Sequence, residues 1–205
     1  MGRFAVPSAL AIGSMVPDLW YFVPLATRDE SHGLAGLIWF CLPLGVLAYL
    51  LFHLLLKQPL IALVAPRLGV FTSAGLPARP WSAVLASLLV GAATHAAWDE
   101  LAHLERWAQH ASTLAGSAIL IVWIARKLAS APARPPCMKA STRLGVAALL
   151  LAAGLLGALG AADSALTFDP ASLRHFLRTS GLAGVEGLSV ALLVYCLLFQ
   201  RKIPA

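Results

Sequence analysis

The chain has 205 residues, of which 60% are hydrophobic and 12% are charged, about half the charged fraction of an ordinary soluble domain. Fifteen lysines and arginines against nine aspartates and glutamates give a net charge of +6, yet a mean hydropathy of +0.81 leaves too little polar surface for a nucleic-acid-binding protein. The three cysteines, Cys41, Cys137 and Cys196, have no zinc-type spacing and support no disulfide framework. The composition therefore argues against a soluble monomer and favours a protein embedded in a bilayer.

Six segments are candidates for membrane-spanning helices, each of which needs about 20 mostly apolar residues. The first, residues 4–25, contains Pro7, Pro17 and Asp18, so a kinked or partly re-entrant helix fits it as well as a straight one. It has no clean signal-peptide cleavage site, and we expect it to be retained. The other five lie at residues 33–56, 82–98, 112–128, 144–162 and 181–199. We predict an all-α integral membrane bundle of about six transmembrane helices.

The positive charges indicate how the chain is oriented in the membrane. Eleven of the fifteen lysines and arginines lie near the N-terminus, in residues 57–80, in residues 126–143 or in the C-terminal tail. Cationic loops stay on the cytoplasmic side, so we predict a multi-pass protein of the cell (inner or plasma) membrane with both termini in the cytoplasm. If the first segment does not span, the N-terminus moves to the other side while the later loops keep their assignment. Its expected partner is the lipid bilayer, and no nucleic acid is expected.

We expect three regions along the chain. Residues 1–129 form a four-helix membrane region with a polar cluster, residues 130–143 a cytoplasmic linker, and residues 144–205 a two-helix membrane region. Glycines recur every three residues in both helices of the last region, which predicts that their backbones approach closely. These glycines are Gly154, Gly157, Gly160, Gly181, Gly184 and Gly187.

The densest polar motif spans residues 94–103 and carries His95, Asp99 and His103 at intervals of four. On a helix such residues share one face, because an offset of four rotates the position by about 40°. Neutral histidine nitrogens and carboxylate oxygens suit Zn²⁺ or Mn²⁺ without thiolates. The spacing predicts a divalent-metal site, with the alternative that these groups only cap the outer end of the third span.

The predicted topology brings further polar residues to the same outer face. Asp18 falls near the outer end of the first segment, His32 at the outer start of the second span, and His110 just before the fourth. Helix-end or interfacial roles are the alternative for each of them. Ionisable residues at membrane depth are costly and tend to be paired or functional, which also singles out Glu186 in the last span as a structural partner or pore-lining group.

Four blocks of this sequence resemble the prokaryotic multi-pass membrane proteins grouped as domain-of-unknown-function family 4184. The blocks are residues 11–18, which end in Pro17-Asp18, residues 31–36, which begin with Ser31-His32, residues 94–103 and residues 109–112. The similarity covers residues 6–127, and the last two spans match only in hydrophobic character. Family members usually carry an earlier Ser-His-Pro segment, so we expect either a true start upstream of Met1 or one missing ligand.

The pattern also resembles, more distantly, inner-membrane proteins described as predicted metal-dependent hydrolases. That resemblance implies that Asp18, His32, His95 and Asp99 bind a metal directly, with His103 and His110 in support. Together with the spacing of His95, Asp99 and His103, this gives Asp18, His32, His95, Asp99 and His103 as the expected metal ligands, and the expected metal is Zn²⁺ or Mn²⁺.

These observations together predict a metal-dependent hydrolase that acts on a lipid-linked or other ester or phosphoester of the cell envelope, with His110 or Glu100 transferring protons. The sequence has no nucleophile elbow, Walker loop, dinucleotide fingerprint or H-E-x-x-H motif, which argues against serine hydrolases and nucleotide-driven proteins. The alternative is a non-enzymatic membrane protein, either a small carrier that uses Asp18 and Glu186 or a structural partner. Substrate, metal identity and oligomeric state stay open.

Overall fold

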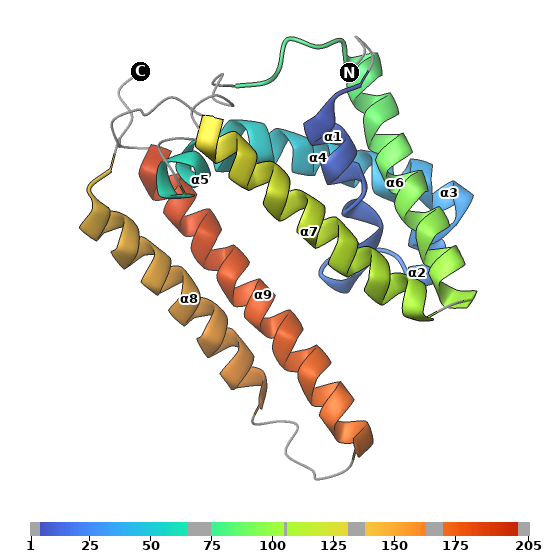
Figure 1. Cartoon of the computed structure of the whole chain (residues 1–205). Coiled ribbons are helices and arrows are strands. Elements are labelled where there is room, and N and C mark those ends of the chain that lie inside the picture. Colours follow the sequence, from blue (N-terminus) through green and yellow to red (C-terminus); the bar gives the residue numbers. More distant parts are fainter. Residues whose placement is uncertain (1–4, 65–74, 105, 131–137, 163–169, 201–205) are drawn as a thin grey trace. The chain divides into compact units, whose positions relative to one another are not determined.

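The computed structural model describes residues 5–64, 75–104, 106–130, 138–162 and 170–200, and within these ranges the chain forms helices and no strand. The prediction of an all-α fold is confirmed for this part of the chain. Contacts divide the chain into two units, residues 1–54 with 73–132 and residues 55–72 with 133–205. The helices of both units are shown in Figure 1. The predicted linker over residues 130–143 stays a prediction, since residues 131–137 lie outside the described ranges.

The first unit begins with two short helices where a first span was predicted. Helix α1 is Pro7–Gly13, and a 3₁₀ helix, Val16–Tyr21, follows it. Pro17 has no backbone N–H to donate, so the regular bonds of an α-helix cannot continue through it. The segment is therefore interrupted, as the kinked alternative allows, and Asp18 lies in the 3₁₀ helix.

The other helices of the first unit are short at first and longer toward its end. In chain order they are α2 Arg28–His32, α3 Leu34–Gly36, a π-helical turn Leu37–Cys41, α4 Leu42–Leu51, α6 Trp81–Leu104 and α7 Arg106–Ser130. Pro43, at the start of α4, cannot donate the hydrogen bond of a regular helix, which accounts for the wide turn before it.

Helix α1 packs closely against α6. A Cβ on Gly13 would clash with the backbone of Leu88, and one on Gly91 would clash with the backbone carbonyl of Leu10, so only glycine permits this approach. The backbone N–H of Val6 donates to Ser87 Oγ at 3.0 Å. Because this contact holds α1 along α6, it also determines where the 3₁₀ helix with Asp18 meets the later turns of α6.

The second unit contains α5 Lys57–Val64, which continues the π-helical turn Phe52–Leu56, together with α8 Ala140–Ala162 and α9 Pro170–Gln200. A Cβ on Gly157 would clash with the backbone carbonyl of Ala183. The predicted close packing of the two glycine-rich helices is thus confirmed. Arg143 Nε donates to the Leu63 carbonyl at 3.0 Å and Tyr195 Oη to the Pro59 carbonyl at 3.1 Å, which ties α5 to both helices.

Four helices are long and apolar enough to cross a membrane: Leu34–Leu63, Trp81–Leu101, Ala140–Gly160 and Thr179–Phe199. A shorter apolar helix, His110–Arg126, lies within α7. These helices indicate a multi-pass membrane protein, but the predicted number of six spans is not confirmed. The orientation of the termini stays a prediction.

Candidate metal centre

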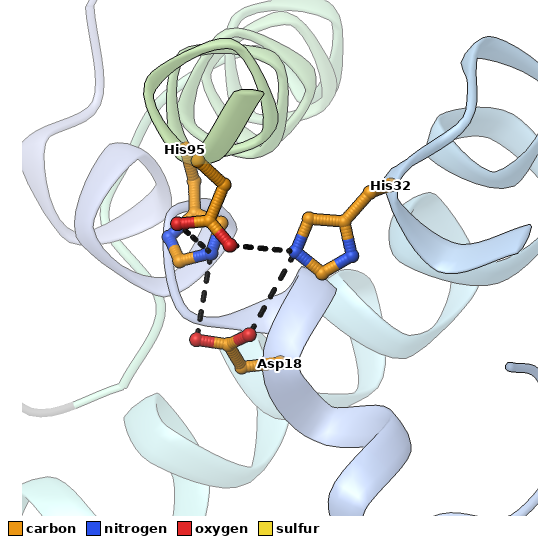
Figure 2. A group of neighbouring side chains, drawn as sticks. Asp18, His32 and His95 are labelled. Carbon is orange, nitrogen blue, oxygen red and sulfur yellow. Dashed lines mark ion pairs between the residues drawn. The ribbon is translucent and has the colours of Figure 1, made fainter. Parts of the chain in front are cut away.

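Two histidines and two aspartates converge in the first unit from three segments of the chain. Asp18 comes from the 3₁₀ helix, His32 is the last residue of α2, and His95 and Asp99 lie one turn apart on α6. One ligand atom from each of the four residues lies within 4.8 Å of the others, and all four side chains are partly buried. Figure 2 shows the imidazoles of His32 and His95 turned toward the carboxylate of Asp18. This group of four residues, called the ligand cluster below, can hold a metal ion.

The two imidazole nitrogens face different oxygens of each carboxylate, at distances equal to or longer than those around a small divalent ion. His32 Nε2 lies 3.7 Å from Asp18 Oδ1 and 3.5 Å from Asp99 Oδ2. His95 Nε2 lies 3.4 Å from Asp18 Oδ2 and 4.0 Å from Asp99 Oδ1. Zinc bonds of about 2.1 Å in a tetrahedral arrangement place neighbouring ligand atoms about 3.4 Å apart. A set with one atom from each residue spans up to 4.8 Å, so the four side chains would have to draw closer together to bind one ion.

The backbone of α2 determines which nitrogen of His32 is available. His32 Nδ1 lies 3.0 Å from the carbonyl oxygen of Arg28 and 2.9 Å from Ser31 Oγ. A carbonyl oxygen only accepts, so Nδ1 carries the proton and donates it, and Nε2 presents a lone pair to the ligand cluster. A metal-binding histidine is commonly oriented in this way by a backbone carbonyl.

Both histidines direct a buried Nε2 atom into the ligand cluster. Neither the Nε2 of His32 nor that of His95 has a partner with hydrogen-bond geometry among the described residues. Leaving a buried polar atom without a hydrogen bond costs about 1–3 kcal/mol. A proton on Nε2 of His95 would face the Asp18 carboxylate at 3.4 Å, and a bound cation would take the place of this proton and give both nitrogens a partner. The residues present therefore fit a divalent metal.

The environment of Asp18 keeps its carboxylate in the state that binds metal. Polar contact with the His95 imidazole lowers the pKa of Asp18 below its ordinary value, and the electrostatic effects of His32 and Arg28 add to this. Partial burial opposes the shift but does not cancel it. Asp18 is therefore ionised at neutral pH. Its side chain is 49% exposed, which leaves the ligand cluster open to solvent on this side.

A capping box and a close backbone contact hold α2 in place. The backbone N–H of Glu30 donates to Thr27 Oγ1, and the Glu30 carboxylate accepts from the backbone N–H of Thr27 at 2.8 Å. The backbone N–H and the hydroxyl of Thr27 both donate to the Glu30 carboxylate and lower the pKa of Glu30. A Cβ on Gly36 would clash with the Glu30 carbonyl, and Cys41 Sγ donates to the Ser31 carbonyl at 3.3 Å. The turn that carries His32 is thus fixed from both ends.

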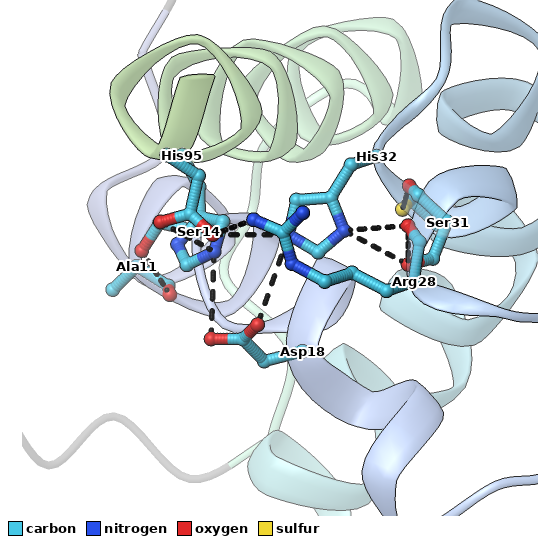
Figure 3. A network of polar contacts seen from close by, with 9 residues as sticks. Ala11, Ser14, Asp18, Arg28, Ser31, His32 and His95 are labelled. Carbon is cyan, nitrogen blue, oxygen red and sulfur yellow. Dashed lines mark hydrogen bonds and ion pairs between the residues drawn. The ribbon is translucent and has the colours of Figure 1, made fainter. Parts of the chain in front are cut away.

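Arg28 is the residue of this site that the sequence analysis missed. Its Nη2 donates to Asp99 Oδ2 at 3.2 Å, and the two side chains are 35% and 25% exposed. Figure 3 shows the guanidinium extending over the ligand cluster from the side of α2. Nothing in the sequence signals this contact, because the two residues are 71 positions apart.

Two other predicted site residues, Glu100 and His110, do not belong to the ligand cluster. Glu100 and His110 are exposed, on α6 and α7. His103 lies in α6, but its side chain is outside the described residues. The structure therefore brings together Asp18, His32, His95 and Asp99 of the five predicted ligands, while the role of His103 and the proton-transfer roles of Glu100 and His110 stay predictions.

A family model described as a domain of unknown function (DUF4184) matches residues 1–108. This stretch is more than half of the chain and contains the whole ligand cluster. The chain belongs to the DUF4184 family. The resemblance seen in the sequence is thus confirmed for the family. None of the curated proteins and none of the solved structures matches this DUF4184 protein.

Proposed function

We propose that this DUF4184 protein is a metal-dependent hydrolase of the cell membrane, with its metal held by the ligand cluster. The observation that carries the proposal is the convergence of two buried imidazole nitrogens and two carboxylates within 4.8 Å of one another. A divalent metal in such a site polarises the scissile bond and lowers the pKa of a bound water toward about 7.

The donor set favours Zn²⁺ or Mn²⁺ over other ions. Two neutral imidazole nitrogens and two carboxylate oxygens are ligands of intermediate hardness, and the cluster contains no thiolate. The charges of Asp18 and Asp99 balance those of a divalent ion. Because Asp18 is half exposed, water and substrate can reach the cluster past its side chain.

The reaction we propose is the hydrolysis of an ester or phosphoester of the cell envelope. The oxygen of water bonds to the acyl carbon or the phosphorus, the ester bond breaks, and the leaving alcohol takes up a proton. Glu100 or His110 would move this proton, since both are exposed and carry titratable groups. We place the reaction at the outer face of the membrane, in line with the distribution of positive charge in the sequence.

The first test is the metal content of the detergent-purified full chain, measured by plasma mass spectrometry. We expect about one Zn²⁺ or Mn²⁺ per chain, lost in His95→Ala and in Asp99→Ala. Glu186→Ala serves as the matched control, because this carboxylate is exposed on α9 and outside the ligand cluster. All variants are compared at equal helicity and equal elution volume, so that a misfolded variant is not taken for a ligand variant.

Two results would contradict the proposal. One is an absence of metal in the wild type after incubation with Zn²⁺ or Mn²⁺. The other is a metal content that stays the same in His95→Ala and Asp99→Ala. If metal binds as expected, the loaded protein is assayed with nitrophenyl acetate and nitrophenyl phosphate. Hydrolysis of neither by the loaded wild type would point to the non-enzymatic alternative.

A further inference from the structure

We propose that Arg28 is an anion-binding residue of this site and that the ligand it selects carries a phosphate group. This inference rests on the proposed function, because it assumes that the ligand cluster binds a divalent metal. It adds a substrate class to that function and a residue that determines it.

The guanidinium of Arg28 has unused hydrogen-bond donors beside the ligand cluster. Its Nη2 donates to Asp99 Oδ2 at 3.2 Å, and the structure describes no second partner for the guanidinium in the ranges it covers. An arginine carries five N–H donors in a fork that matches two phosphate oxygens. The side chain is 35% exposed, so an anion can reach the remaining donors.

The net charge of the site also favours an anionic ligand. The two carboxylates of the ligand cluster balance a divalent ion, and Arg28 then adds one positive charge that the cluster does not compensate. Asp29 and Glu30 follow Arg28 in the chain, but both are exposed, and the Glu30 carboxylate accepts hydrogen bonds from Thr27. An anion bound between Arg28 and the metal would complete the balance.

Arg28 would distinguish phosphoesters from neutral carboxylic esters. A carboxylic ester carries no charge before water attacks it, so a guanidinium beside the metal adds little to its binding. A phosphoester keeps an anionic oxygen in the free, bound and hydrolysed states. Arg28 would contribute to the binding of both a phosphoester and the phosphate released from it.

The position of the site in the helices suggests where such a phosphate comes from. His32 lies two residues before the span that begins at Leu34, and Asp99 two residues before the end of the span at Leu101. Leu34 and Leu101 are 85% and 62% exposed. The ligand cluster therefore lies at the ends of two spans, where lipid headgroups are found. A lipid headgroup and a soluble phosphoester share the same phosphate chemistry, and the experiment below distinguishes them.

The experiment uses the full chain in detergent micelles, loaded with one equivalent of Zn²⁺ and titrated calorimetrically with inorganic phosphate. Phosphate is the probe because its binding requires no turnover. Arg28→Gln is expected to weaken phosphate binding about ten- to hundredfold, and Arg28→Lys by less, because charged hydrogen bonds of this kind are lost. Arg126→Gln is the matched control, since Arg126 is exposed on α7, and a change below about twofold is expected there.

Zinc affinity is measured on the same variants to distinguish two roles of Arg28, binding an anion and only positioning Asp99. We expect Arg28→Gln to bind Zn²⁺ at least as tightly as the wild type, because Arg28 competes with the metal for Asp99 Oδ2. Weaker zinc binding in Arg28→Gln, with phosphate affinity restored by excess Zn²⁺, would mean that Arg28 only positions Asp99 and would overturn the inference. Equal phosphate affinity in wild type and Arg28→Gln would also overturn it, while leaving the metal site intact. Absence of zinc binding in the wild type would overturn the proposed function itself.

Phosphatidic acid in mixed micelles and glycerol 3-phosphate in solution are then compared as competitors of inorganic phosphate. Displacement by both compounds supports the phosphate site. If phosphatidic acid displaces inorganic phosphate at least tenfold more strongly than glycerol 3-phosphate does, the source of the phosphate is a lipid headgroup. If the two compounds displace it equally, the source is a soluble phosphoester. Displacement by neither compound would contradict the inference, because the site would then not accept a phosphoester.

Discussion

Replacing Gly13 with alanine tests whether the packing of α1 against α6 positions Asp18. A Cβ at this position would lie about 1 Å closer to the Leu88 backbone than an ordinary contact. The neighbour is backbone and cannot rotate away, so the two helices must separate or strain. Overpacking of this kind costs about 1–3 kcal/mol, more than the gain of up to about 1 kcal/mol from alanine in a helix. We expect the free energy of unfolding to fall by about 1–2 kcal/mol.

The same displacement would reach the ligand cluster. Asp18 follows Gly13 by five residues, and metal bonds tolerate deviations of about 0.2 Å. A movement of about 1 Å would remove Asp18 from the metal, and we expect the zinc affinity to fall about ten- to hundredfold. Zinc affinity is measured by competition with a chromophoric chelator, and stability by denaturation in mixed micelles.

Gly116→Ala is the matched control for this prediction. Gly116 lies within α7, and nothing stands within 4 Å of a Cβ placed there. The same substitution should therefore stabilise the protein by up to about 1 kcal/mol and leave the zinc affinity unchanged. If Gly13→Ala and Gly116→Ala behaved alike in both measurements, the close contact of α1 with α6 would not position Asp18, and the reasoning would be refuted.

Three further predictions concern pH, the orientation of His32 and the second unit. The pKa of Asp18 is lowered below its ordinary value, so its carboxylate stays ionised as the pH falls from about 7 to about 5, and the ratio of zinc affinities between wild type and Asp18→Asn should stay constant over this range. A chelator titration in which that ratio falls toward one by about pH 5 would contradict this. Ser31→Ala removes a contact of His32 Nδ1 and should lower zinc affinity up to about tenfold, whereas Ser14→Ala, which removes only a bond to the Ala11 carbonyl, should leave it unchanged. Gly157→Ala should weaken the packing of α8 on α9, seen as a lower free energy of unfolding, while Gly160→Ala, with open space around its Cβ, should not.

Hydropathy and helical spacing predicted a large part of this structure. Apolar runs locate the long spans because a bilayer imposes a minimum length of about 20 residues on each. The interval of four between His95 and Asp99 predicted a shared face, since local helical geometry depends on spacing alone. The glycines of the last two spans predicted close packing for a similar reason, because a missing side chain is visible in the sequence.

The number of spans was harder to predict than their existence. Residues 4–25 are apolar enough for a span, but the structure forms α1, ends it at Gly13 and continues as a 3₁₀ helix through Asp18. Pro17 predicted an interruption of the helix but did not indicate which structure would follow it. The path of this segment depends on the contact between α1 and the backbone of α6. That contact is tertiary, so no local sequence pattern predicts it.

Arg28 shows why the partners of a site are harder to predict than its ligands. Asp18, His32, His95 and Asp99 stand out because ionisable side chains at membrane depth are costly and tend to be paired or functional. An arginine in a short polar connection is ordinarily a solvated surface cation, so its presence there does not predict a contact with the site. Its contact with Asp99 arises only when α2 is capped by Thr27 and lies beside the last turns of α6. If Arg28 binds an anion, the role of the residue that determines the substrate depends on tertiary structure. The four residues that could hold a metal can instead be recognised from their chemistry and spacing.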